Sequence, residues 1–165
     1  MNINTLISEI TQAIATDNTL RTWSLSTYDQ VHKVYVNADA KNQPGEADCP
    51  FVVLFPSSKV VGETQSTKYH ELVVMCVVND SSASLENYGL DNVTEYAGVV
   101  RLETFRKYVE SAISTEISSD STNFMNVSIN MVEVNYETME EFPFMVAEML
   151  IGFTEDVPIG SDYLL

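Results

Sequence analysis

Cysteine, glycine and positive charge are all scarce in this sequence of 165 residues. It contains 2 Cys, 6 Gly and 8 Lys or Arg, against 24 Asp or Glu. Two cysteines are too few for a disulfide framework, and Cys76 lies in an apolar run, where a free thiol behaves as a small hydrophobic group. The sequence therefore favours a reducing, cytosolic setting and a core that needs no covalent cross-links.

Motifs for hydrolytic chemistry are missing as well. No Gly-x-Ser-x-Gly occurs, and the glycines are too scattered to form a phosphate-binding loop. The two candidate bases, His32 and His70, fall among apolar residues of predicted strands, which indicates structural or surface histidines. Cys76 and His70 would lie about 20 Å apart along one strand, too far to act as nucleophile and base. We expect no enzyme activity, and an enzyme of unrecognised type is the least favoured alternative.

Metal-binding and cofactor-binding patterns are equally weak. Two Cys and two His, scattered along the chain, do not have the clustering of a zinc site. Glu137, Glu140 and Glu141 could approach a hard cation, yet the Asp/Asn-and-Gly loop of a calcium site is missing there. A solvated acidic turn is the favoured interpretation, and no cofactor or metal is expected.

The charge is strongly one-sided. The formal net charge is −16, and no Lys or Arg follows Lys107, whereas 11 Asp and Glu do. Such a surface should repel phosphate backbones, so tight nucleic-acid binding is disfavoured. Three interpretations stay open: a solubilising surface, a surface that meets a basic partner, and a surface past which a polyanion moves without sticking.

The hydrophobic runs are short. The longest unbroken run, Leu72–Val78, has seven residues, far fewer than a membrane span requires. No signal peptide is expected, because the N-terminus has no basic segment and Glu9 interrupts its apolar pattern.

Two apolar segments form the expected centre of the fold. Phe51–Phe55 lies between two prolines, and Leu72–Val78 follows after a polar connection. Both are rich in β-branched and aromatic residues, and neither alternates with polar residues, which is typical of central strands covered on both faces. The connection from Ser57 to Thr67 predicts a protruding β-hairpin. Within it, Val60 and Val61 indicate burial against something.

The rest of the chain predicts an α+β domain over residues 1–155 and a C-terminal arm over 156–165. The expected architecture is a mostly antiparallel five-stranded sheet with two helices, in the order αβββαββ. The expected elements are a helix from Ile3 to about Asp17 with Asn2 or Asn4 as N-cap, a loop or ragged edge strand over 21–30, a strand over 31–36, a long loop over 37–50, the two central strands, a helix over roughly 91–115 with an Asn92/Glu95 capping box, a strand over 127–134 with a bulge at Met131–Val132, an acidic turn over 135–143, and a last strand over 144–153.

Comparing the apolar strand surface with the available helices leads to an assembly hypothesis. Segments 51–55, 72–78 and 144–153 are apolar on both faces, yet two helices can cover only one face of a five-stranded sheet. The uncovered face would exceed the apolar patch that soluble monomers tolerate. Either the hairpin and tail fold back, or a second copy covers it, and we expect a homo-oligomeric ring. The candidate interface residues are Val60, Val61, Glu63, Tyr163, Leu164 and Leu165.

The chain resembles tail terminator (tail completion) proteins of long-tailed bacteriophages. The resemblance covers most of residues 1–155. It lies in the order αβββαββ, in the short acidic chain, and in Asp48-Cys-Pro-Phe-Val-Val-Leu-Phe-Pro56, which leads into the long hairpin and Tyr69-His-Glu-Leu-Val-Val-Met75.

This resemblance implies a virion structural protein, made in the bacterial host cytoplasm. It implies a hexameric ring that caps the tail tube, ends its polymerisation and joins it to the head connector. The implied partners are further copies of the chain, the tail tube protein and head-connector or neck proteins, with DNA only as passing cargo and no membrane. The alternatives are another neck or tube protein, and an acidic adaptor or inhibitor that binds a basic protein.

Overall fold

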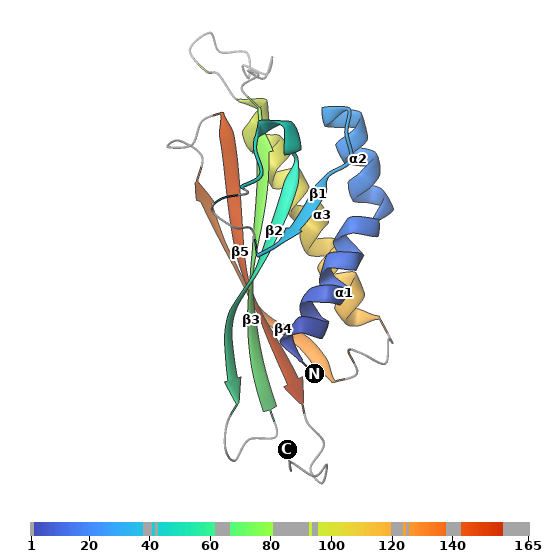
Figure 1. Cartoon of the computed structure of the whole chain (residues 1–165), viewed down its shortest axis with the longest axis vertical. Helices are drawn as coiled ribbons and strands as arrows, with labels where there is room; N and C mark the ends of the chain where they lie inside the picture. Colours follow the sequence, from blue (N-terminus) through green and yellow to red (C-terminus); the bar gives the residue numbers. More distant parts are fainter. Residues whose placement is uncertain are drawn as a thin grey trace.

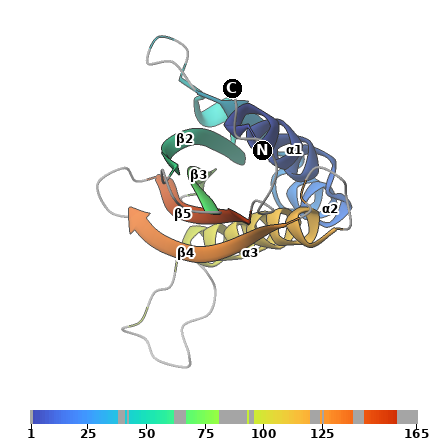
Figure 2. The same cartoon turned by 90° about the horizontal axis from the view of Figure 1, so that it is seen from below.

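The computed structural model describes residues 2–37, 41, 43–61, 67–80, 93, 96–119, 124, 126–137 and 143–156, with only the backbone of 59–61. Over these ranges the chain forms one five-stranded sheet with a layer of helices on one side (Figures 1 and 2). The elements are α1 (Ile3–Thr16), α2 (Asn18–Tyr28), β1 (Lys33–Val36), a 3-10 turn η1 (Glu46–Asp48), β2 (Phe51–Val61), β3 (Thr67–Asn79), α3 (Ala97–Ser118), β4 (Val127–Glu137) and β5 (Phe144–Asp156).

The strand order across the sheet is β1-β2-β3-β5-β4. β1 pairs with β2 in parallel, and the other three pairings are antiparallel. The α+β class, the five strands and the mostly antiparallel sheet are therefore confirmed, as is the hairpin between the two central strands. These strands are longer than their apolar runs indicated, since β2 continues to Val61 and β3 begins at Thr67.

One predicted segment is wrong. Residues 21–30 were expected as a loop or ragged strand, but Asn18–Tyr28 is helix α2. Asp17 ends α1, and its Oδ1 accepts a hydrogen bond from the Leu20 backbone N–H at 2.7 Å, so it also caps α2. Because only Leu20 and Ser24 of α2 are fully buried, the segment carries too few apolar residues for a visible helical stripe.

Several boundaries also differ from expectation: β4 continues to Glu137, into the predicted acidic turn over 135–143, and β5 continues to Asp156, beyond the predicted end at 153. α3 begins at Ala97 with Tyr96 as N-cap, so the start near residue 91 is wrong; Asn92 and Glu95 lie outside the described residues. The bulge in β4 falls between Ile129 and Met131, one step earlier than expected. The N-cap of α1 is Asn2, whose Oδ1 accepts a hydrogen bond from the Asn4 N–H at 3.0 Å.

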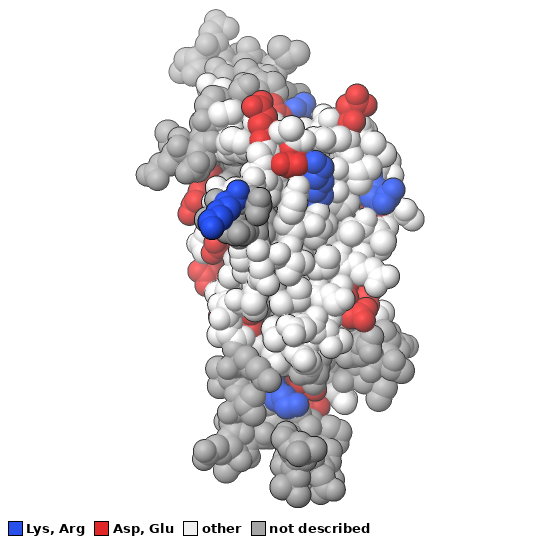
Figure 3. All heavy atoms as spheres, viewed as in Figure 1, with Lys and Arg blue, Asp and Glu red and all other residues white. Residues whose placement is uncertain are grey.

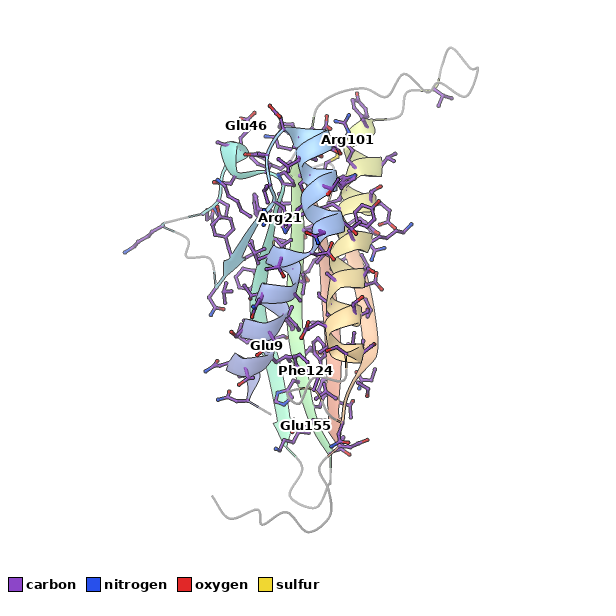
Figure 4. All side chains as sticks on the ribbon, turned by 90° about the vertical axis from the view of Figure 1, so that its right-hand side faces the viewer. Glu9, Arg21, Glu46, Arg101, Phe124 and Glu155 are labelled. Carbon is purple, nitrogen blue, oxygen red and sulfur yellow. The ribbon has the colours of Figure 1, made fainter. Side chains whose placement is uncertain are left out.

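The main core lies between the sheet and the three helices. Figure 4 looks onto this helix layer, in which the helices run along the strands. Its largest fully buried side chains come from both the helices and the sheet and include Leu6, Ile10, Leu20, Leu54, Leu72, Phe105 and Phe153. All three helices cover the same face of the sheet, which leaves the opposite face, called here the open face, to other means of burial.

Candidate functional site

Strand alternation decides which side chains reach the open face. Successive residues of a strand point to opposite sides, so the odd-numbered residues of β2 and β3 lie together. Val53 pairs with Met75 and Phe51 with Val77, and Val77 pairs in turn with Val146 of β5. The sequence indicated that both strands are apolar on both sides, and the odd-numbered residues supply the apolar side chains of the open face.

A second, smaller core has formed on this face. Cys49, Phe51, Val53 and Val77 are at most 5% exposed. Around them stand half-buried apolar side chains that belong to four different strands: Tyr35, Phe55, Met75, Phe144 and Val146. The open face is thus partly sheltered by its own side chains, with an apolar rim that still meets solvent.

The rim surrounds a groove of about 390 Å³. The apolar residues of its floor are Phe51, Val53, Phe55, Met75, Val77, Phe144 and Val146, and its walls include Gln43, Pro44 and Glu137. Tyr35 packs edge-on against Phe51, with ring centroids 5.9 Å apart, which fixes the floor beside β1. An apolar groove of this kind suits an apolar side chain of a partner better than a polar metabolite.

Carboxylates border the groove on its β4–β5 side. By strand register, Glu148 of β5 lies opposite Met75, while Glu133 and Glu137 of β4 lie diagonally across from Glu148. Figure 3 shows carboxylates along the left margin of the molecule, the side that faces away from the helices. Among the described strand side chains of this face, Lys33 carries the one positive charge, and its Nζ lies 2.5 Å from Asp48 Oδ1.

Glu71 is a carboxylate of the open face that hydroxyl groups from both strands of the β2–β3 hairpin hold in place. It accepts hydrogen bonds from Ser57 Oγ at 2.9 Å, Ser58 Oγ at 3.1 Å and Tyr69 OH at 3.2 Å. The two serines stand at the β2 bulge, between Pro56 and Ser58, and the bulge brings both hydroxyls to the same carboxylate. These bonds rigidify the β2–β3 hairpin at the bulge, between the central strands and the hairpin tip.

Other ionisable groups lie on the helix side and hold the fold. Arg106 of α3 is 7% exposed; it donates to Glu103 at 2.8 Å and to Glu110, and Tyr136 OH of β4 donates to Glu103. The Arg106 guanidinium lowers the pKa of Glu103 to about 2. This cluster fastens the edge strand β4 to the helix layer.

Both histidines are buried. His32 is 5% exposed, and its Nε2 lies 2.9 Å from the Ile14 carbonyl, where it donates in the neutral ring. Burial lowers the pKa of His32. His70 is fully buried, with Nε2 3.8 Å from Glu155 Oε2. Both side chains lie on the helix side of the sheet, away from the groove.

The structure places the predicted interface residues unevenly. Val60 and Val61 form the end of β2, paired with Tyr69 and Lys68. Glu63, Tyr163, Leu164 and Leu165 lie outside the described residues, as do the hairpin tip and the arm. The groove residues were not singled out beforehand, although their alternate positions in β2 and β3 are readable once strand register is known.

Neither a metal centre nor a membrane span emerges within the described ranges. No group of three or more His, Cys, Asp or Glu side chains there is arranged to hold a metal ion. Within those same ranges, no helix combines the length and apolar character needed to cross a membrane.

Comparisons with known proteins give a fold likeness. No protein-family model and no curated protein matches the chain. Among solved structures, a chain of "Virion of native gene transfer agent (GTA) particle" superposes with a TM-score of 0.50. The match covers 88% of this chain and 90% of that chain, at 14% sequence identity. At this identity the likeness concerns the fold: this chain shares its α+β architecture with a chain of a virion particle.

Proposed function

We propose that this chain is a structural protein of a phage-like virion and acts by assembling with copies of itself. In its finer form, the proposal is a tail terminator: a hexameric ring that caps the tail tube, ends tube growth and joins the tail to the head connector. The observation that carries it is the open face, where an apolar groove remains half-exposed in the single chain. The fold likeness to a chain of a virion particle supports the same class of function.

The charge distribution fits a ring through which DNA moves. A net charge of −16 repels phosphate, so the wall of a channel made of such subunits would not hold the nucleic acid. The partners in this proposal are neighbouring copies, the tail tube protein and a head-connector or neck protein, and DNA is cargo only.

The carboxylates around the groove favour one alternative. A basic protein with an apolar anchor would complement the acidic residues Glu133, Glu137 and Glu148 together with the groove beside them. The chain would then be an acidic adaptor or inhibitor. Such a complex would have one-to-one stoichiometry and would dissociate when salt is raised.

A pair of matched substitutions tests the proposal. Met75→Glu places a charge on the groove floor, whereas Leu25→Glu places one on α2, where Leu25 is 48% exposed on the helix side. By light scattering at micromolar concentrations, we expect the wild type and the Leu25 variant to be oligomers and the Met75 variant to be a monomer. Circular dichroism confirms that both variants are folded.

Two results would contradict this proposal. A wild-type chain that stays monomeric, alone and in the presence of tail tubes, would remove ring formation. An oligomer unaffected by Met75→Glu would show that assembly does not use the open face.

A further inference from the structure

Apart from the outer edge of β1, two backbone edges of the sheet have no strand partner within the described residues. On one side, β4 pairs only with β5, so its outer edge is open from Val127 to Glu137. On the other side, β1 covers β2 only from Phe51 to Leu54, where the Asn37 N–H donates to the Leu54 carbonyl at 2.9 Å. Beyond Leu54 the outer edge of β2 has no described partner. An unpaired edge is a template for another strand.

The two free edges lie at the same height in the sheet. Reading the register across the strands, Val61 pairs with Lys68, Lys68 with Glu155 and Glu155 with Val127. The same reading places Lys59 in the row of Ile129 and Pro56 in the row of Val132. Each edge also carries one extra residue between those rows, in the bulges of β2 and β4. The two segments 56–61 and 127–132 are therefore level and bent at the same row.

The hydrogen-bonding groups of these edges also match. In an antiparallel sheet, residues bonded to one neighbour alternate with residues bonded to the other. Three pairings separate β2 from β4, so the rows that point outward at one edge also point outward at the other. The outward carbonyl of Leu54 identifies these rows on β2. Counting across the bulge, they continue at Pro56, Lys59 and Val61, level with Val132, Ile129 and Val127.

The composition of the β4 edge supports pairing at this level. From Val127 to Val132 the strand has no charged residue, in a chain of net charge −16, and the acidic residues begin at Glu133. Met131 is 36% exposed and Val132 is 38% exposed, although both are apolar. Edge strands are normally protected by charge, and this half of β4 is not. Beyond Glu133, which is level with Phe55, residues 134–137 are level with the part of β2 that β1 already covers.

We infer that copies of this chain join edge to edge, with residues 127–132 of β4 lying antiparallel beside residues 56–61 of β2 in the next copy. This inference rests on the proposed self-assembly and names its surface. Since β2 and β4 run in opposite directions and are level, a rotation about an axis along the strands brings them together without axial displacement. A head-to-tail contact without displacement cannot build a helical filament, and it closes into a ring when the rotation is a whole fraction of a full turn.

The junction is small. It consists of backbone hydrogen bonds and the exposed apolar side chains Met131 and Val132 of β4. Pro56 has no N–H, and the Val127 N–H is already bonded to the Phe124 carbonyl, so the three outward rows exchange about four hydrogen bonds. The groove lies on the open face near the start of β2, next to the rows of this junction. The neighbouring copy that the junction holds in place would therefore be the one that reaches the groove.

A pair of proline variants tests the inference. Ile129 and Val134 are both partly buried, both contact the core, and both point their N–H outward, so proline at either position spares the β4–β5 ladder. Val134 is level with Leu54, where β1 already sits. We expect Ile129→Pro to raise the concentration needed for half-assembly by about tenfold or more, and Val134→Pro to leave it unchanged.

Cysteine pairs provide a second readout. Residues in a hydrogen-bonded antiparallel pair have Cα atoms about 5.5 Å apart, within disulfide range. Under mild oxidation we expect Lys59→Cys combined with Ile129→Cys to link subunits into a covalent ladder on non-reducing gels. Lys59→Cys with Val134→Cys should not form this ladder, because those residues are not level.

The outcomes separate this inference from the proposed function. If the wild type assembles, Ile129→Pro assembles equally well and the Lys59/Ile129 pair does not cross-link, edge pairing is wrong while self-assembly stands. A wild type that never assembles overturns both. Loss of assembly in the proline variant, together with cross-linking of the level pair only, supports the junction.

Discussion

Gly98, in the first turn of α3, sets how closely this helix approaches the sheet. A Cβ at Gly98 would lie 2.6 Å from Met145 Sδ and 2.8 Å from the Asp80 carbonyl oxygen. Asp80 cannot move easily, because its N–H donates to the Pro143 carbonyl at 3.1 Å and its carboxylate binds Arg101. Met145 is 2% exposed and has little room to rotate. Gly98→Ala should therefore push the start of α3 away from the sheet.

Two opposing effects decide the result of Gly98→Ala. Alanine in place of glycine favours a helix by about 1 kcal/mol at most, and less in a first turn. Overpacking of a buried site costs about 1–3 kcal/mol, and the fixed carbonyl of Asp80 puts this site in the upper part of that range. We expect a net loss of about 1–2 kcal/mol in the free energy of unfolding, equivalent to a fall in Tm of about 2–8 °C for a chain of this size.

Urea unfolding followed by circular dichroism measures this loss, with Gly45→Ala as the matched control. A Cβ at Gly45 meets no atom within 4 Å, so its substitution should change the stability by no more than about 0.5 kcal/mol. A Gly98→Ala variant as stable as the wild type, or more stable, would refute the close approach of α3 to the end of β3.

The remaining predictions concern buried ionisable groups. The pKa of His32 is lowered in the folded chain, so the unfolded chain takes up the proton first as pH falls below about 6.5, and the folded state loses stability toward acid. His32→Gln should therefore flatten the dependence of the free energy of unfolding on pH between about pH 7 and 5. Burial raises the pKa of Cys49 to about 12 and raises that of Cys76, so alkylation at about pH 8 should be on the order of a thousandfold slower than in denaturant; fast labelling of the native chain would contradict this. Arg106→Met should cost about 1–2 kcal/mol and raise the pKa of Glu103 toward its ordinary value, as carbon-detected NMR titration would show; an unchanged Glu103 would contradict the assigned pairing.

The elements that could be predicted from sequence are those whose local pattern agrees with their packing. The apolar, β-branched runs at 51–55 and 72–78 indicated the central strands, and the stripe of Leu6, Ile10 and Ile14 indicated α1. The polar ends of these strands were not predicted as strand. Ser57, Ser58 and Thr67 are polar and at least partly exposed, so they give no apolar strand pattern. Their strand conformation comes from pairing with neighbours, which a single-sequence pattern does not contain.

The candidate site was predictable in kind but not in detail. Excess apolar strand surface indicated an uncovered face, and the structure has all three helices on the opposite side. The helix α2 was missed because its one clear signal, Asp17 as N-cap, stands inside a polar segment. The level free edges of β2 and β4 depend on strand order and register across four strands, so no local pattern reveals them.

Both the proposed ring and the edge-to-edge junction require that the purified wild-type chain closes on itself. Class averages from electron microscopy of the protein at micromolar concentration measure this without any assumption about partners. We expect annular particles with cyclic symmetry, six-fold for a tail terminator, in which each subunit contacts two neighbours. Particles of the size of one 18.4 kDa chain at every concentration, or open filaments in place of rings, would contradict it.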